Sequence, residues 1–426
     1  MKRIIVIGGG PAGMQTALSL KAEGAIPLIV EKESELGGKL RGWHRLFPSF
    51  TPAHEVLGEL RRRVADAGIE CLTGAEASEV EPRQVTLSDG RRLACDGVVV
   101  CSGFTLFDAR IKEEYGYGIY DNVFTSVDLE RMLNQGRVAL QNGNRPRRIA
   151  FLHCVGSRDE KVCQSHCSKV CCVTGVKQAM EMKELFPEAD VFNFYMDIRM
   201  FGPGYEEMYR RAQQDYNIHF VRGRISEASP TIEGRIQIKA EDTLTGRPLK
   251  MSVDMLVLLV GMRANDDNGR LAARTGLRQA PSGFMEPRDR FLGSAGSGVE
   301  GIFYAGAVTA PKNLGESLCD GAAAALAVRD LRVRVAGKQA ADRAGEKAPA
   351  PVERARQALG RQPQREDEPE GREGNAVAHH VARGAAHPHR PRPDPLAPGE
   401  GDAAQHQQQE QVHDCLLYTS PSPRDS

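Results

Sequence analysis

The stretch RIIVIGGGPAG, residues 3–13, decides the fold. Its four consecutive aliphatic residues, Ile4–Ile7, predict a strand that is covered on both faces, as in a parallel sheet. Three glycines then follow in the spacing G-x-G-x-x-G, and we expect a helix over residues 12–23 and a second strand over residues 26–30. A strand, a glycine turn, a helix and an acidic residue at the end of the next strand together predict a dinucleotide-binding βαβ unit.

Each residue type in this unit has a physical role. Gly8 allows the tight turn, Gly10 lets the backbone approach a pyrophosphate, and Gly13 permits close packing of the helix. The first residues of the helix offer free N–H groups to phosphates, and Glu31 accepts hydrogen bonds from ribose hydroxyls. The alternative is a tight βα turn that binds no ligand. The predicted contacts of the unit are Gly8, Gly10, Pro11, Ala12, Gly13, Glu31 and Lys32.

Three further segments favour FAD over NAD as the ligand. Residues 36–39 (LGGK) follow Glu31 where glycines let the chain pass the ribityl and pyrophosphate groups, and residues 98–103 (VVVCSG) form a strand that ends in glycine. Residues 301–306 (GIFYAG) form another strand, which a loop and a helix follow. These segments resemble those of flavoprotein reductases, although the acid that follows the last glycine there is Ala307 here. The predicted FAD contacts in them are Gly37, Gly38, Lys39, Ser102, Gly103, Gly306, Lys312 and Asn313.

Lys312 is the candidate catalytic residue. It precedes the helix that begins at Leu314, so that its positive charge, together with the helix N-terminus, would stabilise an anionic reduced flavin. The alternative is a solvated loop lysine without a chemical role.

Composition excludes several other classes of function. The chain has 426 residues, and its 56 Lys and Arg residues balance 56 Asp and Glu residues, which gives no electrostatic case for nucleic acid or for an anionic membrane. The apolar run at Ile4–Ile7 is too short for a signal peptide, and Met255–Val260 is far shorter than a membrane helix. We therefore expect a cytoplasmic protein that reaches a membrane only through partners.

The order of patterns predicts an α/β protein of two interleaved Rossmann-like, three-layer domains, similar to thioredoxin reductase. The composition changes near Gly337, after which Arg, Pro, Gln, His and Ala dominate, so that a disordered tail is expected there. The last residues of this tail, 415–426, resemble a frameshift or adaptor read-through rather than native sequence. The expected parts are 1–105 and 265–337 (FAD-binding domain), 106–145 (connecting segment), 146–264 (second Rossmann-like domain with the cysteines) and 338–426 (tail).

The second βα unit carries cysteines where a nucleotide-binding turn would carry glycines. A strand from Arg148 to His153 is followed by a segment with only Gly156 before the next helix. Five of the ten cysteines fall in this segment: Cys154, Cys163, Cys167, Cys171 and Cys172. In a protein that is not exported these are reduced thiols, and their clustering favours a metal over disulfides.

Spacing alone leaves several kinds of site open. A redox-active disulfide of the C-x-x-C type has no matching pair in the chain, and the paired C-x-x-C knuckles typical of structural zinc are also absent. An iron–sulfur cluster needs four thiolates and tolerates irregular spacing. Zinc and free or regulatory thiols remain as alternatives.

Several long motifs resemble the A subunit of heterodisulfide reductase and its relatives, including the A subunit of quinone-interacting membrane-bound oxidoreductase complexes. They are residues 153–160 (HCVGSRDE), 167–172 (CSKVCC), 177–179 (KQA), 197–207 (DIRMFGPGYEE) and 209–213 (YRRAQ), which occur in the family's order within residues 1–336. The resemblance implies FAD and a [4Fe–4S] cluster as cofactors. It implies as cluster ligands Cys154, Cys167, Cys171 and Cys172, with Cys163 outside the set.

The resemblance also implies the function. The chain is expected to be an electron-transfer subunit in which FAD switches between two-electron and one-electron transfer and the cluster relays single electrons. Its partners would be other iron–sulfur subunits of a heterodisulfide reductase-like or quinone-interacting complex, with ferredoxin, a hydrogenase or a dehydrogenase as electron donor. The extra ferredoxin-like domains of longer relatives are not evident, which leaves an electron-bifurcating role undecided. The alternatives are a stand-alone NAD(P)H-dependent disulfide or polysulfide reductase and a zinc-containing flavoprotein scaffold.

Overall fold

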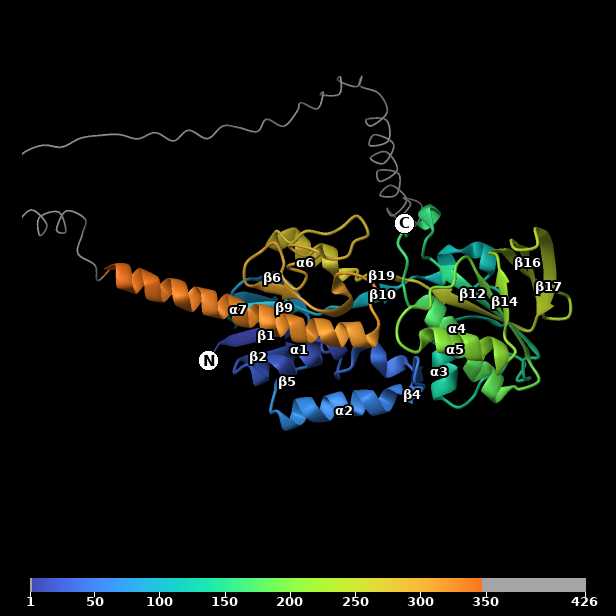
Figure 1. Cartoon of the computed structure of the whole chain (residues 1–426), viewed down its shortest axis with the longest axis horizontal. Helices are drawn as coiled ribbons and strands as arrows, with labels where there is room; N and C mark the ends of the chain where they lie inside the picture. Colours follow the sequence, from blue (N-terminus) through green and yellow to red (C-terminus); the bar gives the residue numbers. More distant parts are fainter. Residues whose placement is uncertain (1, 347–426) are drawn as a thin grey trace, which may run out of the picture. The chain divides into compact units, whose positions relative to one another are not determined.

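A computed structural model describes residues 2–346 of the chain (Figure 1). One compact unit ends at Val335 and contains two five-stranded parallel sheets. The described part of the chain has no helix that is both long and apolar enough to cross a membrane.

The first sheet is built around the strand that precedes the glycine turn. Its strand order is β20-β9-β1-β2-β5, and all neighbours are parallel. The five strands are β1 (Arg3–Ile7), β2 (Ile26–Val30), β5 (Glu70–Leu72), β9 (Gly97–Val100) and β20 (Ile302–Tyr304).

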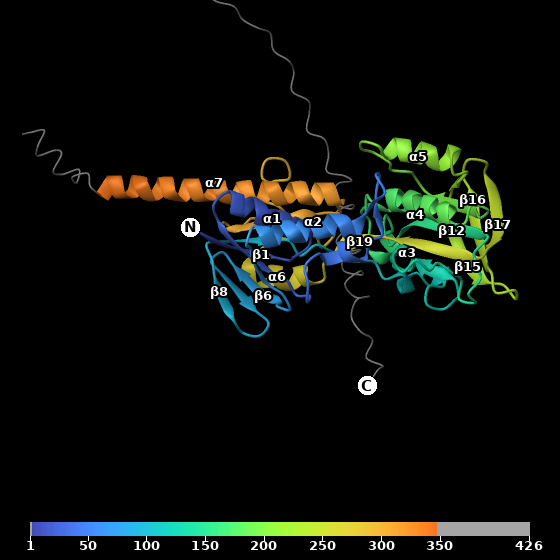
Figure 2. The same cartoon turned by 90° about the horizontal axis from the view of Figure 1, so that it is seen from below.

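Alternate side chains of this sheet enter two different apolar layers. Ile4 and Val6 face α1 (Pro11–Ala22), α2 (Ala53–Asp66) and α7 (Leu314–Glu346). Ile5 and Ile7 face α6 (Asp267–Thr275) and an antiparallel sheet of β6 (Ala77–Glu81), β7 (Gln84–Leu87) and β8 (Arg92–Ala94). Figure 2 shows these two layers on opposite sides of the sheet. Full burial of such a side chain contributes about 1.5–3 kcal/mol to the free energy of unfolding. Burial on both faces of the sheet explains why every residue from Ile4 to Ile7 is aliphatic.

The second sheet repeats the arrangement of the first. Its order is β11-β18-β12-β13-β14, again all parallel. On one face it packs against α3 (Ser126–Asn134), α4 (Cys171–Leu185) and α5 (Tyr205–Gln214), and on the other against an antiparallel sheet. Its strands are β11 (Val123–Thr125), β12 (Arg148–Val155), β13 (Asp190–Tyr195), β14 (His219–Arg222) and β18 (Met255–Val260). The antiparallel sheet contains β15 (Ile225–Pro230), β16 (Ile236–Asp242) and β17 (Arg247–Val253).

Two antiparallel strands carry the chain between the sheets. They are β10 (Phe104–Leu106), on the way out, and β19 (Met262–Ala264), on the way back. The first sheet therefore takes its strands from residues 3–100 and 302–304, and the second from residues 123–260. This is the interleaved α/β organisation expected from the sequence.

Residues 70–81 divide between β5 in the parallel sheet and β6, because Gly74, with a φ of 64°, turns the chain between them. The start of the predicted tail differs from the expectation. α7 continues to Glu346, and the rest of the predicted tail, 347–426, lies outside the described residues. A short hairpin of β3 (Arg45–Leu46) and β4 (Thr51–Pro52) leads into α2.

Candidate functional site

In the turn after β1, the backbone at Gly8 packs closely against the backbone of Cys101 and of α1. A Cβ atom on Gly8, which has a φ of 104°, would lie 2.4 Å from the carbonyl oxygen of Cys101, and one on Gly13 would lie 1.9 Å from the oxygen of Gly8. A Cβ on Gly10 would meet no atom within 4 Å. Gly8 and Gly13 are therefore required by packing, whereas Gly10 keeps open the space that leads to the helix N-terminus.

Glu31 is buried at the end of β2 and faces this turn. Its Oε2 atom accepts a 2.6 Å hydrogen bond from the backbone N–H of Gly9, and its Oε1 atom accepts one of 2.9 Å from Glu33. Hydrogen bonds to a charged acceptor are stronger than neutral ones, so the carboxylate fixes the glycine turn. The hydrogen bond to a ribose that the sequence predicts remains a prediction.

One cavity of about 750 Å³ extends along the carboxyl ends of β1 and β9. Ligand sites of α/β sheets occur at this edge, and the volume is in the range of cofactor pockets. Most of the predicted cofactor-binding residues line it: Gly8, Gly10, Pro11, Ala12, Glu31, Lys32, Gly38, Lys39, Ser102, Gly103, Lys312 and Asn313.

The other predicted residues, Gly13, Gly37 and Gly306, lie behind the cavity wall. The N–H of Gly37 donates a 2.8 Å hydrogen bond to the oxygen of Gly9. A Cβ on Gly306 would lie 2.6 Å from the Cβ of Ala12. These glycines therefore shape the wall by close packing and have no side chain to present to a ligand.

Lys312 lines the cavity but already has partners. Its Nζ atom forms an ion pair with Asp320 of α7 and donates hydrogen bonds to the oxygen of Gly306 at 3.1 Å and to Thr309 Oγ1 at 2.7 Å. Asp320 also accepts a 3.2 Å hydrogen bond from the N–H of Gly306. Asp320, an acid of α7, thus contacts Gly306, the residue that precedes Ala307. The sequence did not indicate this contact. The catalytic role of Lys312 remains a prediction.

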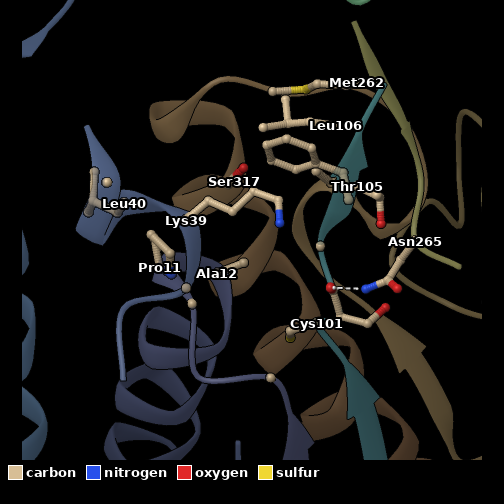
Figure 3. A pocket seen from close by; sticks show the side chains of 18 of the residues that line it. Pro11, Ala12, Lys39, Leu40, Cys101, Thr105, Leu106, Met262, Asn265 and Ser317 are labelled. Carbon is tan, nitrogen blue, oxygen red and sulfur yellow. Dashed lines mark hydrogen bonds between the residues drawn. The ribbon is translucent and has the colours of Figure 1, made fainter. Parts of the chain in front are cut away.

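Several cavity residues were not identified from the sequence. Figure 3 shows Lys39 extending across the pocket toward the strand that carries Thr105 and Leu106. The Lys39 Nζ atom lies 5.3 Å from the centre of the Phe104 ring. Asn265 donates a 2.7 Å hydrogen bond to the backbone oxygen of Ser102, which fixes the segment that follows β9 (Figure 3). These contacts join residues 39 and 104 and residues 102 and 265, so no local motif reveals them.

The predicted metal ligands surround the turn between β12 and α4. Cys154 is the penultimate residue of β12, and Cys171 and Cys172 are the first two residues of α4. These three are buried and Cys167 is half-buried. The sulfur atoms of Cys154 and Cys171 lie 3.9 Å apart, and the Cys167 sulfur accepts a 3.3 Å hydrogen bond from the N–H of Lys169.

The surroundings favour the ionised form of Cys154 and Cys172, whereas hydrogen bonds to these two sulfurs and burial raise the pKa of Cys171. A hydrogen bond with Cys171 and the contact with His153 lower the pKa of Cys172 to about 4, and the contact with Cys171 also lowers the pKa of Cys154. Arg158 is close enough for electrostatic interaction with both Cys154 and Cys167. Thiolates at a helix N-terminus beside cationic groups are the state in which cysteines bind metals.

The donor set has the chemistry of an iron–sulfur site. Within residues 2–346, however, no group of three or more His, Cys, Asp or Glu side chains has the spacing that would hold a single metal ion. A structural zinc ion needs four ligands converging on one point, whereas a [4Fe–4S] cluster accepts thiolates that bind different iron atoms. The thiols therefore fit a cluster by their chemistry, and their role as its ligands remains a prediction.

The two turns meet at the cavity. The cavity that Gly10 and Lys312 line is also lined by residues at the start of α4. These are Val170, Cys171 and Thr174. The start of α4, which includes Cys171, therefore borders the predicted flavin site.

Comparison with known proteins supports FAD as a cofactor and the fold. Residues 3–43 match the FAD binding domain family, which supports FAD as the ligand of the cavity. The thioredoxin reductases of T. acidophilum and Lactococcus lactis share the fold, with TM-scores of 0.57 and 0.56 at 17% and 16% identity. Each comparison covers 78% of this chain and 100% of the other chain. Identity at this level shows the fold alone.

Curated relatives are more informative. The chain is 31% identical over 418 residues to the iron–sulfur A subunit of the CoB–CoM heterodisulfide reductase of Methanocaldococcus jannaschii. It is 35% identical over 420 residues to the A subunit of the H(2)/formate:CoB-CoM heterodisulfide,ferredoxin reductase of Methanococcus maripaludis. Both alignments cover 77% of this chain but only 64% of the relative, so the chain spans less than two thirds of their length. Over this span the chain is a homologue of the heterodisulfide reductase A subunits.

Proposed function

We propose that the chain is an FAD- and [4Fe–4S]-containing electron-transfer subunit of a heterodisulfide reductase-like oxidoreductase complex. The observation that carries this proposal is the cavity that Gly10, Lys312 and Cys171 line together. A thiolate ligand at the wall of a flavin site places a one-electron carrier next to a two-electron carrier. FAD, when bound, supplies the exchange between the two kinds of electron transfer.

The chain's own residues have separate roles in this proposal. Gly10 and the first turn of α1 bind the pyrophosphate through the backbone, and Glu31 holds that turn in place. Lys312, at the start of α7, adds positive charge close to the flavin, and Asp320 fixes its ammonium group.

The cluster ligands in this proposal are Cys154, Cys167, Cys171 and Cys172. Three observations support them: the helix N-terminus at Cys171, the cationic Arg158 beside the thiols, and the word "iron-sulfur" in the name of the M. jannaschii relative. A net negative cluster is stabilised by such donors and charges.

The proposed partners are other iron–sulfur subunits of the complex. The names of the relatives include a heterodisulfide, hydrogen or formate, and ferredoxin. By this analogy, ferredoxin, a hydrogenase or a dehydrogenase would be the electron donor. Contact with a membrane would come only through a partner.

Reduction of the anaerobically purified chain tests the proposal. Dithionite is expected to bleach the flavin and to produce the electron paramagnetic resonance signal of a reduced [4Fe–4S] cluster, whereas NADH alone is expected to leave the flavin oxidised. Rapid bleaching by NADH without a cluster signal would favour the stand-alone NAD(P)H-dependent reductase instead. One zinc ion per chain in place of iron would favour the zinc-containing scaffold.

A further inference from the structure

A group of buried charged residues lies at one wall of the cavity, between α3 and α4. The side chains of Glu130, Lys177 and Glu181 are only 1–2% exposed. The Lys177 ammonium forms an ion pair with Glu130 Oε1 and lies 3.1 Å from Glu181 Oε2. Gln178 donates a 2.7 Å hydrogen bond to Glu130 Oε1. The group therefore contains two carboxyl groups and one ammonium group inside an otherwise apolar layer.

The charges of this group do not balance without one more proton or one more cation. Burial of an uncompensated charge is costly, and one ammonium group neutralises one carboxylate. The second carboxyl group is then either protonated or paired with another cation. Burial raises the pKa of Glu181, the nearby Glu130 carboxylate raises it further, and Lys177 opposes both effects. Glu181, whose Oε2 atom lies against Lys177 and whose Oε1 atom lies against His44, is thus the carboxyl group placed to take up and release a proton.

His44 connects this group to solvent. Its Nδ1 atom lies 2.9 Å from Glu181 Oε1, and its side chain is 28% exposed. Its backbone N–H donates a 2.7 Å hydrogen bond to Glu130 Oε2. The neighbouring Arg45 contributes its carbonyl oxygen, 3.2 Å from Lys177 Nζ, while its guanidinium pairs with Glu184 at the surface.

The opposite end of the group reaches the cavity. Glu130 and Lys177 line it, whereas Glu181 and His44 are not among its lining residues. Adjacent members of the series His44, Glu181, Lys177 and Glu130 are within hydrogen-bond or ion-pair distance. The series therefore runs without a gap from solvent to the cavity wall.

We infer that His44, Glu181 and Lys177 form a proton path that joins solvent to the flavin cavity, with Glu130 holding the Lys177 ammonium group at the cavity wall. This inference rests on the proposed function, because it needs FAD in the cavity. Two-electron reduction of a flavin takes up at least one proton, and the electrons arrive separately from the redox partner. The path itself carries protons only.

Each transfer along the path conserves charge. Lys177 gives a proton to the acceptor in the cavity and takes the proton of the Glu181 carboxyl group. The resulting Glu181 carboxylate takes a proton from His44, and His44 takes one from water. An imidazole can receive a proton at one nitrogen while it releases one from the other, so His44 is suited to the solvent end. Each cycle brings one proton from water to the cavity.

The rate of proton uptake tests the path in the full-length, FAD-loaded chain. The flavin is reduced by rapid mixing with reduced methyl viologen, a one-electron donor whose oxidation releases no proton, and a pH-indicator dye follows the uptake of protons. We expect His44→Gln to slow this uptake at least tenfold with an unchanged FAD content, and added imidazole to restore it. The matched control His54→Gln changes an exposed histidine of α2 and should stay within twofold of the unaltered chain.

A second measurement needs no flavin. The infrared spectrum of the flavin-free chain is expected to contain the band of a protonated carboxyl group that Glu181→Gln removes. Glu184→Gln, which changes a half-exposed glutamate near the end of the same helix, should leave the band in place. Circular dichroism checks that both variants are folded.

Two results would overturn the path: an unchanged rate of proton uptake in His44→Gln, or an infrared band that Glu181→Gln does not affect. A chain that lacks iron would instead contradict the proposed function, and the infrared measurement would still decide whether Glu181 holds a proton. The two failures are therefore distinguishable.

Discussion

The turns after β1 and after β12 occupy equivalent positions in two sheets of the same topology, yet they are built in opposite ways. In the first, three residues (8–10) separate β1 from α1, and only backbone faces the cavity. In the second, residues 156–170 separate β12 from α4, and cysteine side chains surround the start of the helix. The same parallel βα framework can therefore present either backbone N–H groups to an anion or sulfur atoms to a metal.

Backbone conformation shows the same contrast. The glycine turn uses a positive φ only at Gly8, where no side chain opposes it. Among the described residues seven that are not glycine have a positive φ, and four of them lie in or beside the second turn: Cys154, Arg158, Cys163 and Lys169. Such conformations cost on the order of 1 kcal/mol each and persist where the surroundings require them. The second turn is therefore held in a shape that its local sequence does not favour.

Removal of one clustered sulfur is expected to have the largest effect. Cys171→Ala should reduce the iron content from about four atoms per chain to almost none, because the cluster loses a ligand at the helix N-terminus. The FAD content should stay near one per chain, since the glycine turn is unchanged. Iron and flavin analysis measures both. Cys319→Ala, which changes an exposed cysteine of α7, is the control, and equal iron in both variants would disprove the ligand assignment.

Gly13→Ala should disrupt the first turn by packing alone. The added Cβ would lie 1.9 Å from the oxygen of Gly8, so α1 must move, and we expect the free energy of unfolding to fall by about 1–3 kcal/mol. Gly58→Ala is the matched control, because Gly58 lies inside α2 with no atom within 4 Å of the added Cβ. This control should become more stable by about 0.5–1 kcal/mol. Denaturant titration of both variants decides, and equal stability would contradict the close packing.

Gly10→Ala separates ligand binding from folding. Because the added methyl group meets no protein atom, the free energy of unfolding should change by less than about 0.5 kcal/mol. The same methyl group would project where the pyrophosphate approaches, so FAD affinity should fall about tenfold or more. Equilibrium dialysis against FAD measures this loss. Full affinity in this variant would show that the phosphates bind elsewhere.

Lys312→Gln should have the smallest effect. Loss of one partly buried positive charge near a helix N-terminus is worth about 0.5–1 kcal/mol, which lowers the midpoint potential of a two-electron couple by about 10–20 mV. Spectroelectrochemical titration of the bound flavin checks the value. An unchanged potential would assign Lys312 to the ion pair with Asp320 alone.

The sequence predicted the features that local patterns encode. The strand, turn and helix of residues 3–30 are confirmed, because buried parallel strands and glycine turns have strict residue requirements. A helix also follows the cysteine-containing segment, as expected, although it begins within that segment, at Cys171.

Contacts between distant segments escaped prediction. Asp320 contacts Gly306 and Lys312 across a loop, and nothing in its neighbourhood in the sequence marks it. Glu181 and His44 come from segments 137 residues apart, and Glu181 reads as an ordinary helix surface residue. Such positions depend on how the two sheets pack, which a pattern of spacing does not contain.

Quantitation of iron, acid-labile sulfide and flavin in the anaerobically purified chain tests the central claim most directly. The account predicts about four iron atoms, about four sulfides and about one FAD per chain. A yellow preparation without iron would contradict it, and the second turn would then be a cluster of thiols in a plain flavoprotein.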